Sequence, residues 1–262
     1  MSKAKRLAAK ASSTPNPKFA RDSSPYVSQR EKLDWNLSIR ERNDLTDKQK
    51  ALIELVLDKQ TKVVFISGPA GTSKTWLAVY CGLLLLQQRR VSHITFVRTI
   101  AESASKSLGA LPGEIEDKIS PYLMPLMDKL DELLPSSDTK RLMAEDRVHG
   151  LPVNHLRGAS LNAQYIVLEE SQNWTAKELT TALSRIGQYS KCVVIGDPMQ
   201  SDINGASSFQ PFYDLFNEPS SQEQGIHCVS FTKDDIVRSG ILRHLIERIE
   251  WFNAQRTTHV KP

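Results

Sequence analysis

Cysteine and long apolar runs are both scarce in this chain of 262 residues. The three cysteines, Cys81, Cys192 and Cys228, lie far apart without metal-ligand spacing, and an odd number cannot form a complete disulfide framework. We therefore expect buried free thiols and a reducing compartment. No stretch reaches the length of a membrane-spanning helix, and no apolar signal core follows the basic start MSKAKRLAAKASS. These absences predict a protein of the cytoplasm that has no membrane partner.

Basic residues are unevenly distributed. Up to Arg42 the sequence has ten Lys and Arg residues against four Asp and Glu, while the formal net charge of the whole chain is only +4. Residues 1 to 43 also mix Ser and Pro with few apolar anchors, which is typical of a disordered arm. Two interpretations stay open for this arm: a solubilising tail, or an electrostatic contact with nucleic acid.

The stretch VVFISGPAGTSKT, residues 63 to 75, is the most informative part of the chain. Its β-branched and aromatic start predicts a buried strand, and the apolar residues that follow predict a helix. A glycine-rich turn between a strand and a helix presents backbone N–H groups to phosphate oxygens. The pattern therefore predicts a nucleotide site that consists of Gly68, Pro69, Ala70, Gly71, Thr72, Ser73, Lys74 and Thr75.

Individual side chains in and near this P-loop have expected roles. We expect Lys74 to reach the β- and γ-phosphates of ATP and the Thr75 hydroxyl to join the Mg²⁺ shell. The motif GxxxxGK[ST] has glycine where this chain has Ser73, so the serine either follows a different turn or accepts a small strain. Upstream, Gln49 is placed like a glutamine that reads the adenine edge, although an ordinary exposed helix glutamine is the alternative.

Two later apolar runs end in polar residues. The run at 163 to 168 ends in Glu169 and Glu170, which is the Walker B design: the first carboxylate holds Mg²⁺ through its waters, and the second is the general base. Aspartate is commoner at the first of these places, so Glu169 is a departure. The run at 191 to 196 is followed by Asp197 and then by Gln200, which we expect to sense the γ-phosphate.

Several arginines are further candidates. Arg98 follows a predicted strand at 93 to 97, so it is expected at the ligand-binding edge of the sheet. Arg185 is in the last turn of a predicted helix, where it either complements the helix dipole or acts as an arginine finger toward the ATP of a neighbour. Arg157 and Arg238 are the alternative fingers.

The remaining segments set the expected boundaries. Prolines at 112, 121 and 125 are expected to divide residues 108 to 134 into short helices. Residues 227 to 231 predict an edge strand, and residues 234 to 251 predict an amphipathic helix. We expect a single domain over residues 44 to 254 and a frayed end over residues 255 to 262.

With these stretches together, the chain resembles the PhoH-like family, the phosphate-starvation-inducible-type P-loop ATPases related to the superfamily 1 helicase core. The resemblance rests on the following stretches: GPAGTSKT, FVRTIAES, LGALPGEIEDKISPYLMPLMDKL, RGASLN, IVLEESQN, LSRIG and VVIGDPMQ. It implies one RecA-like α/β domain with a mostly parallel sheet flanked by helices. It also implies ATP binding and hydrolysis and a link to RNA or DNA, in a short form of the kind found in bacteria and phages.

Helicase motors of this class close ATP between two RecA-like domains, and this chain is long enough for one. We therefore expect a second subunit to complete the site, in a ring that is expected to be hexameric. Two functions remain in competition. The first is an ATPase that is coupled to RNA or single-stranded DNA, and the second is an ATP-dependent assembly switch that acts through protein contacts. A metabolic kinase of P-loop type would not explain Gln200.

Overall fold

The computed structural model describes residues 36–99, 115–203, 207–237 and 240–258. The compact unit that contains these residues spans residues 35 to 262. Six parallel strands form one sheet in the order β3-β2-β4-β5-β1-β6. The strands are β1 (Val63–Ser67), β2 (His93–Arg98), β3 (Val148–Pro152), β4 (Gln164–Glu169), β5 (Lys191–Gly196) and β6 (Ile226–Ser230).

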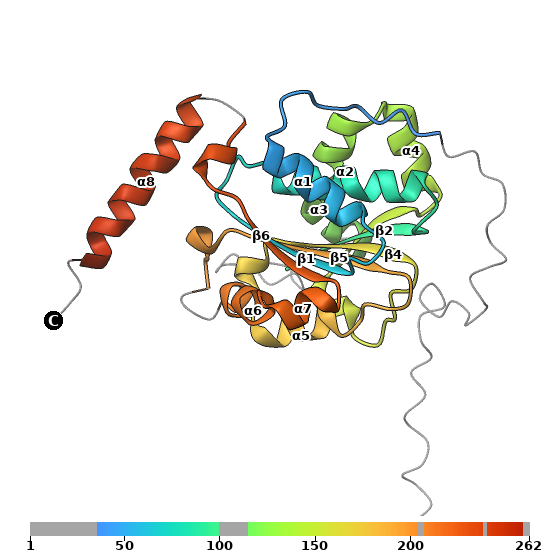
Figure 1. Cartoon of the computed structure of the whole chain (residues 1–262). Helices are drawn as coiled ribbons and strands as arrows, with labels where there is room; N and C mark the ends of the chain where they lie inside the picture. Colours follow the sequence, from blue (N-terminus) through green and yellow to red (C-terminus); the bar gives the residue numbers. More distant parts are fainter. Residues whose placement is uncertain (1–35, 100–114, 204–206, 238–239, 259–262) are drawn as a thin grey trace, which may run out of the picture. The chain divides into compact units, whose positions relative to one another are not determined.

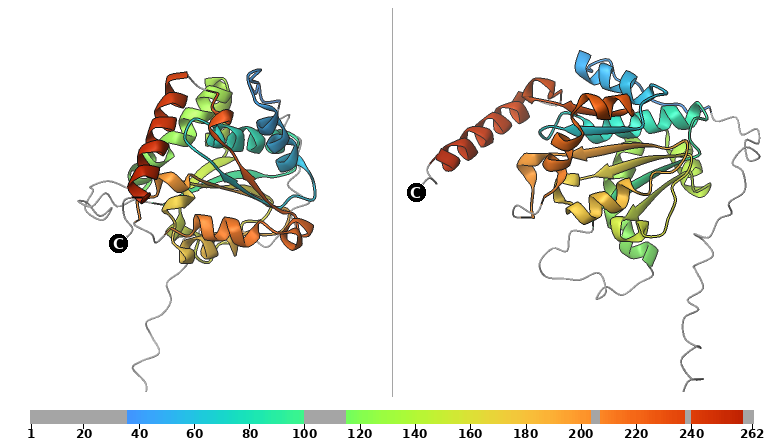
Figure 2. Two further views of the ribbon diagram at one scale, coloured as in Figure 1. Left: turned by 60° about the vertical axis from the view of Figure 1, so that its left-hand side comes forward. Right: turned by 60° about the horizontal axis from the view of Figure 1, so that its bottom comes forward.

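Helices cover both faces of the sheet (Figure 1). One face has α1 (Asp47–Leu57), α2 (Lys74–Gln87), α3 (Ile115–Leu133) and α4 (Ser136–Ala144). The other face has α5 (Ala176–Leu183), α6 (Phe209–Phe216) and α7 (Pro219–Glu223), and the views in Figure 2 show the same three layers. Because parallel strands are joined by crossover helices, a sheet of this kind is buried on both sides. The mostly parallel α/β architecture predicted from the sequence is confirmed.

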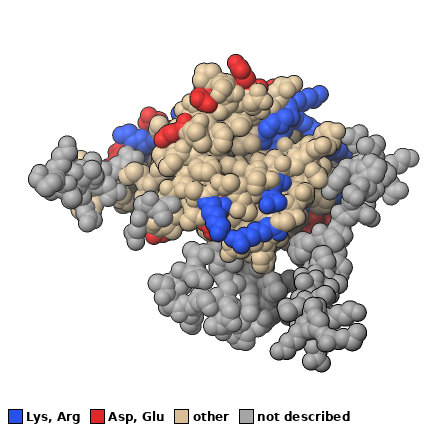
Figure 3. Space-filling model, turned by 90° about the horizontal axis from the view of Figure 1, so that it is seen from below, with Lys and Arg blue, Asp and Glu red and all other residues tan. Residues whose placement is uncertain are grey.

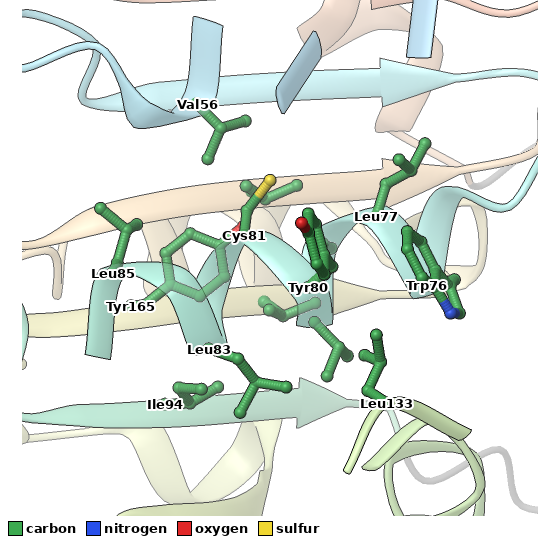
Figure 4. Packing of buried hydrophobic residues seen from close by; sticks show 14 of the residues in the cluster. Val56, Trp76, Leu77, Tyr80, Cys81, Leu83, Leu85, Ile94, Leu133 and Tyr165 are labelled. Carbon is green, nitrogen blue, oxygen red and sulfur yellow. The ribbon is translucent and has the colours of Figure 1, made fainter. Parts of the chain in front are cut away.

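Side chains of β1 show how the two faces share the core. Val64 and Ile66 belong to the cluster that packs against α1, α2 and α3, whereas Val63 and Phe65 belong to the cluster on the α5 and α6 side. Successive strand residues point to opposite faces, so one apolar run supplies both clusters. Figure 4 shows part of the first cluster, in which α2 presents Leu77 and Cys81 among the buried side chains.

The carboxyl ends of the strands bring the motifs together. Ser67 at the end of β1 pairs with Gly196 at the end of β5, and Arg98 at the end of β2 pairs with Glu169 at the end of β4. The strand that precedes Asp197 thus lies between the P-loop strand and the strand of the paired carboxylates. This strand order collects the polar residues that follow the strands at one edge of the sheet, where ligands bind in open α/β sheets.

The N-terminal segment differs from the prediction of a disordered tail up to residue 43. Leu37 is buried, with 4% of its surface exposed, and the Arg40 backbone N–H donates to the Leu133 carbonyl at 2.8 Å. The Ser38 N–H donates to the Asp138 carboxylate at 3.0 Å. Residues 36 to 43 therefore belong to the folded unit. Composition misled the prediction because one apolar anchor and a few backbone hydrogen bonds are enough to hold an extended segment against helices.

Helix α3 also differs from the prediction, because it runs unbroken through Pro121 and Pro125. A proline inside a helix removes one hydrogen bond and costs about 3 kcal/mol. Its fixed φ is nevertheless compatible with a helix, and Leu126, Leu130 and Leu133 are fully buried farther along α3. Burial of these side chains offsets the cost. Residue 112 lies outside the described residues.

The C-terminal helix is α8 (Gly240–Thr258), which begins later than the helix predicted over residues 234 to 251 and continues past its predicted end. Ile236 precedes it in an extended conformation and is buried. The predicted apolar face of this helix is largely uncovered in the chain, since Ile241 is 65% exposed and Ile249 is 53% exposed. The predicted edge strand is confirmed as β6, which borders only β1. In the described part of the chain, no helix is long and apolar enough to cross a membrane.

Candidate nucleotide site

The P-loop follows β1 and leads directly into α2. The backbone φ angles of Gly68 and Gly71 are 151° and 85°, values that residues other than glycine rarely adopt. Ser73, at the usual glycine position, also has a left-handed backbone, with φ of 62° and ψ of 25°. Of the two outcomes left open for this serine, the chain follows the glycine-like turn and accepts the strain, which costs about 1–2 kcal/mol.

Lys74 is held inside this loop. Its ammonium donates to the Gly68 carbonyl at 2.6 Å and to the Pro69 carbonyl at 2.8 Å. Burial lowers the pKa of Lys74, while nearby carboxylates of Asp197 and Glu169 act in the opposite direction. The lysine therefore lies inside the loop, and its charge is supported by Glu169 at the end of β4 and by Asp197 after β5.

The strand-end carboxylate Glu169 faces the P-loop. The Thr75 hydroxyl donates to Glu169 Oε1 at 2.7 Å, and Glu169 Oε2 is buried without a hydrogen-bond partner in the described structure. Burial raises the pKa of Glu169 to about 7, although the Thr75 hydrogen bond lowers it. A hydroxyl beside a carboxylate with an unused oxygen suits Mg²⁺, which binds oxygen ligands and is held by one or two carboxylates together with substrate phosphates.

Glu170 adopts a left-handed backbone with φ of 54°, which turns its side chain from the strand into the pocket. One of its oxygens lies 3.7 Å from Arg98 Nη2, and the other accepts a hydrogen bond from Gln172 Nε2. The same Gln172 amide accepts from the backbone N–H of Asp197 at 3.1 Å. The buried Gln172 thus links the second carboxylate to the end of β5.

The sequence prediction assigned no role to Gln172, although it lies in the stretch IVLEESQN that carried the resemblance. Its backbone carbonyl accepts a further hydrogen bond from the Ser201 hydroxyl. Spacing alone could not identify it, because its partner Asp197, just after β5, is 25 residues away in sequence.

Beyond β5, Asp197 is the N-cap of the 3₁₀ helix η5 (Pro198–Gln200), and Gln200 is the last residue of that helix. Burial raises the pKa of Asp197, whereas Lys74 lowers it, and the carboxylate accepts from the Met199 N–H at 3.0 Å. The side chain of Asp197 thus supports the turn while it faces the P-loop lysine. Gln200 is exposed at the rim of the pocket.

These groups line one pocket with a volume of about 270 Å³. The predicted residues that line it are Ala70, Gly71, Ser73, Lys74, Thr75, Glu169, Glu170, Asp197 and Gln200. The predicted residues Gly68, Pro69, Thr72 and Arg98 do not line it. Residues to which the sequence prediction gave no role complete the lining. The newly placed residues are Arg42, Trp76, Lys129, Glu132, Gln172, Ile195 and Gly196. The first of these comes from the segment that precedes α1, and two others come from α3, so the pocket mouth is made by elements outside the recognised motifs.

Gln49 lies elsewhere than expected. Its side chain is completely buried, and its Nε2 donates to the Thr72 carbonyl at 3.0 Å and to the Asp235 carbonyl at 3.1 Å. Its Oε1 accepts from the Thr46 N–H in a capping box at the start of α1. Both amide N–H groups are therefore used within the protein, and this geometry supports the P-loop from behind in place of the predicted adenine contact.

The candidate arginine fingers are separate from the pocket. Arg185 follows α5, and its backbone carbonyl accepts from the Leu161 N–H beside the bridge between Leu161 and Ile186, ahead of β4. It is thus near the amino ends of the strands, whereas the pocket is at their carboxyl ends. Arg157 is exposed after the 3₁₀ helix η3 (Val153–Leu156). Neither lines the pocket. Arg238 lies outside the described residues.

Comparisons with known proteins agree with this geometry. The family model described as PhoH-like protein matches residues 42–250. A PhoH-like protein of Mycobacterium tuberculosis is 35% identical over 201 residues, which cover 76% of this chain and 55% of that protein. A PhoH-like protein of Bacillus subtilis is 35% identical over 190 residues, which cover 72% of this chain and 58% of that protein. The chain thus spans little more than half the length of these relatives.

A weaker likeness is to a solved structure described as the Sulfolobus solfataricus SWI2/SNF2 ATPase core in complex with dsDNA. Its TM-score is 0.43 at 11% identity, and the match covers 75% of this chain and 46% of that one. The family assignment rests on the family model and the relatives instead. Most of the chain matches the model, and the P-loop and carboxylates meet in one pocket, so the chain belongs to the PhoH-like family of P-loop NTPases.

Proposed function

We propose that this protein binds ATP with Mg²⁺ and hydrolyses it. The observation that carries the proposal is the contact between the Thr75 hydroxyl and Glu169, whose second carboxylate oxygen is buried without a partner. Thr75 and Glu169 would hold Mg²⁺ together with the phosphates on the P-loop. When bound, the ion neutralises charge that develops on the phosphoryl oxygens.

Glu170 is the proposed general base. It lies at the pocket with two polar contacts, Arg98 at 3.7 Å and Gln172, that orient its carboxylate. In this role Glu170 accepts a proton from the attacking water, a contribution of typically 10²–10⁴-fold. Lys74 supports the phosphates, and Gln200 at the rim helps to position the water.

A second subunit is proposed to close the open side of the pocket. Arg185 follows α5 near the amino ends of the strands and does not line the pocket of its own chain, so as an arginine finger it would act on a neighbour, in a homo-oligomer that we propose to be a hexameric ring. An arginine supplied in trans can contribute 10³-fold or more. ATPase activity is then expected to rise with protein concentration, and Arg185→Ala subunits should lose most of it. Wild-type rates in Arg185→Ala would contradict this role.

We further propose that hydrolysis is coupled to RNA or single-stranded DNA. Support comes from the ten basic residues up to Arg42 and from Arg98 beside the general base. On the face of α5 to α7 seen in Figure 3, Lys and Arg side chains form separate groups divided by uncharged surface. The described residues visible there form no continuous basic track, and the proposed contact is argued from the N-terminal arginines and lysines and from the pocket edge.

The test is the ATPase rate with and without single-stranded RNA and DNA, at two salt concentrations. Wild type is compared with Lys74→Ala and Glu170→Gln. Hydrolysis that is lost in both variants and stimulated by one polymer, less so at high salt, supports the coupled ATPase. Hydrolysis unaffected by either polymer favours the competing assembly switch. Absence of hydrolysis in wild type would contradict the proposal and direct attention to Ser73 and Glu169.

A further inference from the structure

We propose that Arg42 contacts the phosphate chain of the bound nucleotide and that Ser73 holds its guanidinium in position. The inference rests on the proposed binding of ATP to this P-loop. It gives a role to Ser73, which replaces the usual glycine of the motif. It also gives a role to residues 36 to 43, which the composition had assigned to a disordered tail.

Arg42 is fixed at the mouth of the pocket by three neighbours. Its Nη1 donates to Ser73 Oγ at 3.2 Å, and its Nε and Nη2 donate to the Asp44 carboxylate at 2.8 and 2.6 Å. The guanidinium also lies over the Trp76 ring, 5.2 Å from the ring centroid. Trp76 is buried and stacked on Tyr80, a pair visible near the start of α2 in Figure 4. The cation therefore lies on a rigid platform.

The guanidinium keeps donors for a ligand. Arginine has five N–H groups. Among the described residues, three of the Arg42 N–H groups donate to Asp44 and Ser73, so two N–H groups remain for a ligand. The Arg42 side chain lines the pocket and is 22% exposed. Phosphate oxygens are the ligands that a planar guanidinium binds best, with two parallel hydrogen bonds. Because Ser73 directly precedes Lys74, phosphates on the loop pass beside Arg42.

The segment that carries Arg42 is held in place. Two residues earlier, the Arg40 N–H donates to the Leu133 carbonyl, and the Arg40 side chain donates to the Asp131 and Glu132 carbonyls at the end of α3. Leu37 is buried in the same cluster as Trp76. Arg42 thus approaches the P-loop from an anchored backbone, which reduces the entropy that binding would otherwise cost.

The strained backbone of Ser73 points to the same conclusion. Glycine would adopt φ of 62° without a steric penalty, yet the chain has serine, whose hydroxyl accepts the Arg42 hydrogen bond. In the described structure the Ser73 hydroxyl makes this hydrogen bond to Arg42, and a glycine at position 73 could not make it. We infer that the serine is retained to position Arg42.

The test measures affinity for Mg·ATP and for Mg·tripolyphosphate by calorimetry. Arg42→Ala is expected to weaken both ligands about tenfold to a hundredfold, because a charge-assisted hydrogen bond is lost. Arg42→Lys should restore part of the affinity. Lys50→Ala removes an exposed charge of the same sign from the nearby α1, so it serves as a control and should bind within twofold of wild type.

Ser73 variants separate the hydroxyl from the backbone. Ser73→Ala and Ser73→Gly should both weaken binding a few-fold, whereas only Ser73→Gly should raise the melting temperature, by a few degrees. Equal or tighter binding by Ser73→Gly would overturn the inference, and so would unchanged binding by Arg42→Ala. If Lys74→Ala alone loses binding, the proposed function stands and the inference fails. If wild type binds neither ligand, both fail.

Discussion

Two buried charged side chains lie at opposite edges of the same sheet. Glu169 ends β4 at the carboxyl edge and is 5% exposed, and Lys191 begins β5 at the amino edge and is 8% exposed. Burial raises the pKa of Glu169 to about 7 and lowers the pKa of Lys191 to about 8. In both cases the protein interior disfavours the charged form.

The difference between them is in their partners. The Lys191 ammonium donates to the Asp58 carbonyl and, at 2.6 Å, to the Thr61 carbonyl, so it joins β5 to the chain that follows α1. Glu169 has one oxygen bonded to Thr75 and one without a partner. A buried charge that is held by two backbone carbonyls serves the fold. One with an unused oxygen at the pocket is available for a ligand.

The largest effect is expected for Glu169→Gln. The amide keeps the size of the side chain but removes the charge, so turnover should fall by about two orders of magnitude or more. The free energy of unfolding should stay level or rise, because a neutral group is easier to bury. Steady-state ATPase assays and urea unfolding check both parts. Glu169→Asp, which introduces the residue that is commoner at this place, should retain most turnover. Wild-type turnover in Glu169→Gln would contradict the role of Glu169 in ligand binding.

A second effect is the dependence on pH. Mg²⁺ needs the ionised Glu169, so Mg²⁺-dependent nucleotide binding should weaken about tenfold per pH unit below about 7. The folded state also keeps the Glu169 proton up to a higher pH than the unfolded chain does. This contribution to stability is therefore present below the ordinary value of 4.5 and is lost as pH rises through about 7.

Lys191 should show the opposite trend. Its folded pKa of about 8 is below the ordinary 10.5, so stability should increase as pH rises between these values. Urea unfolding across pH, with Glu169→Gln and Lys191→Met as controls that each flatten one of the two windows, measures both contributions. If the free energy of unfolding still changes with pH in the same window after the corresponding residue is replaced, another group is responsible for that change.

A smaller effect is expected for Lys191→Met. The apolar side chain leaves the carbonyls of Asp58 and Thr61 without this donor, at a cost of about 1–3 kcal/mol in the free energy of unfolding. ATPase activity per folded molecule should not change, because Lys191 is at the far edge of the sheet. Chemical unfolding and ATPase assays on the same preparation measure both. If Lys191→Met lost turnover without losing stability, Lys191 would serve the activity and not the fold.

The smallest effect is expected for Gln172→Leu. This change removes the hydrogen bonds to Glu170 and to the Asp197 N–H while it keeps a similar volume. We expect kcat to fall about tenfold, in the range of one lost hydrogen bond to a charged group, with little change in KM. A change confined to KM would show that Gln172 acts on nucleotide binding and does not position Glu170.

Much of the site could be predicted from the sequence. The apolar runs before the P-loop, before Glu169 and before Asp197 were long and β-branched enough to identify three parallel strands, and polar residues after such strands meet at one edge. Gln49 was placed wrongly because its partners, Thr72 and Asp235, are distant in sequence. The division of α3 at Pro121 and Pro125 was wrong because burial outweighed a local helix preference.

The sequence by itself determined the family, the strand ends and the residue types of the P-loop and paired carboxylates. Each of these depends on short-range patterns of apolar and glycine residues. Only the tertiary structure decided that Glu169 keeps an oxygen without a partner, that Gln172 links Glu170 to β5, and that Arg42 reaches Ser73. These contacts join residues that side-chain packing brings together, and local sequence patterns carry no information about such pairs.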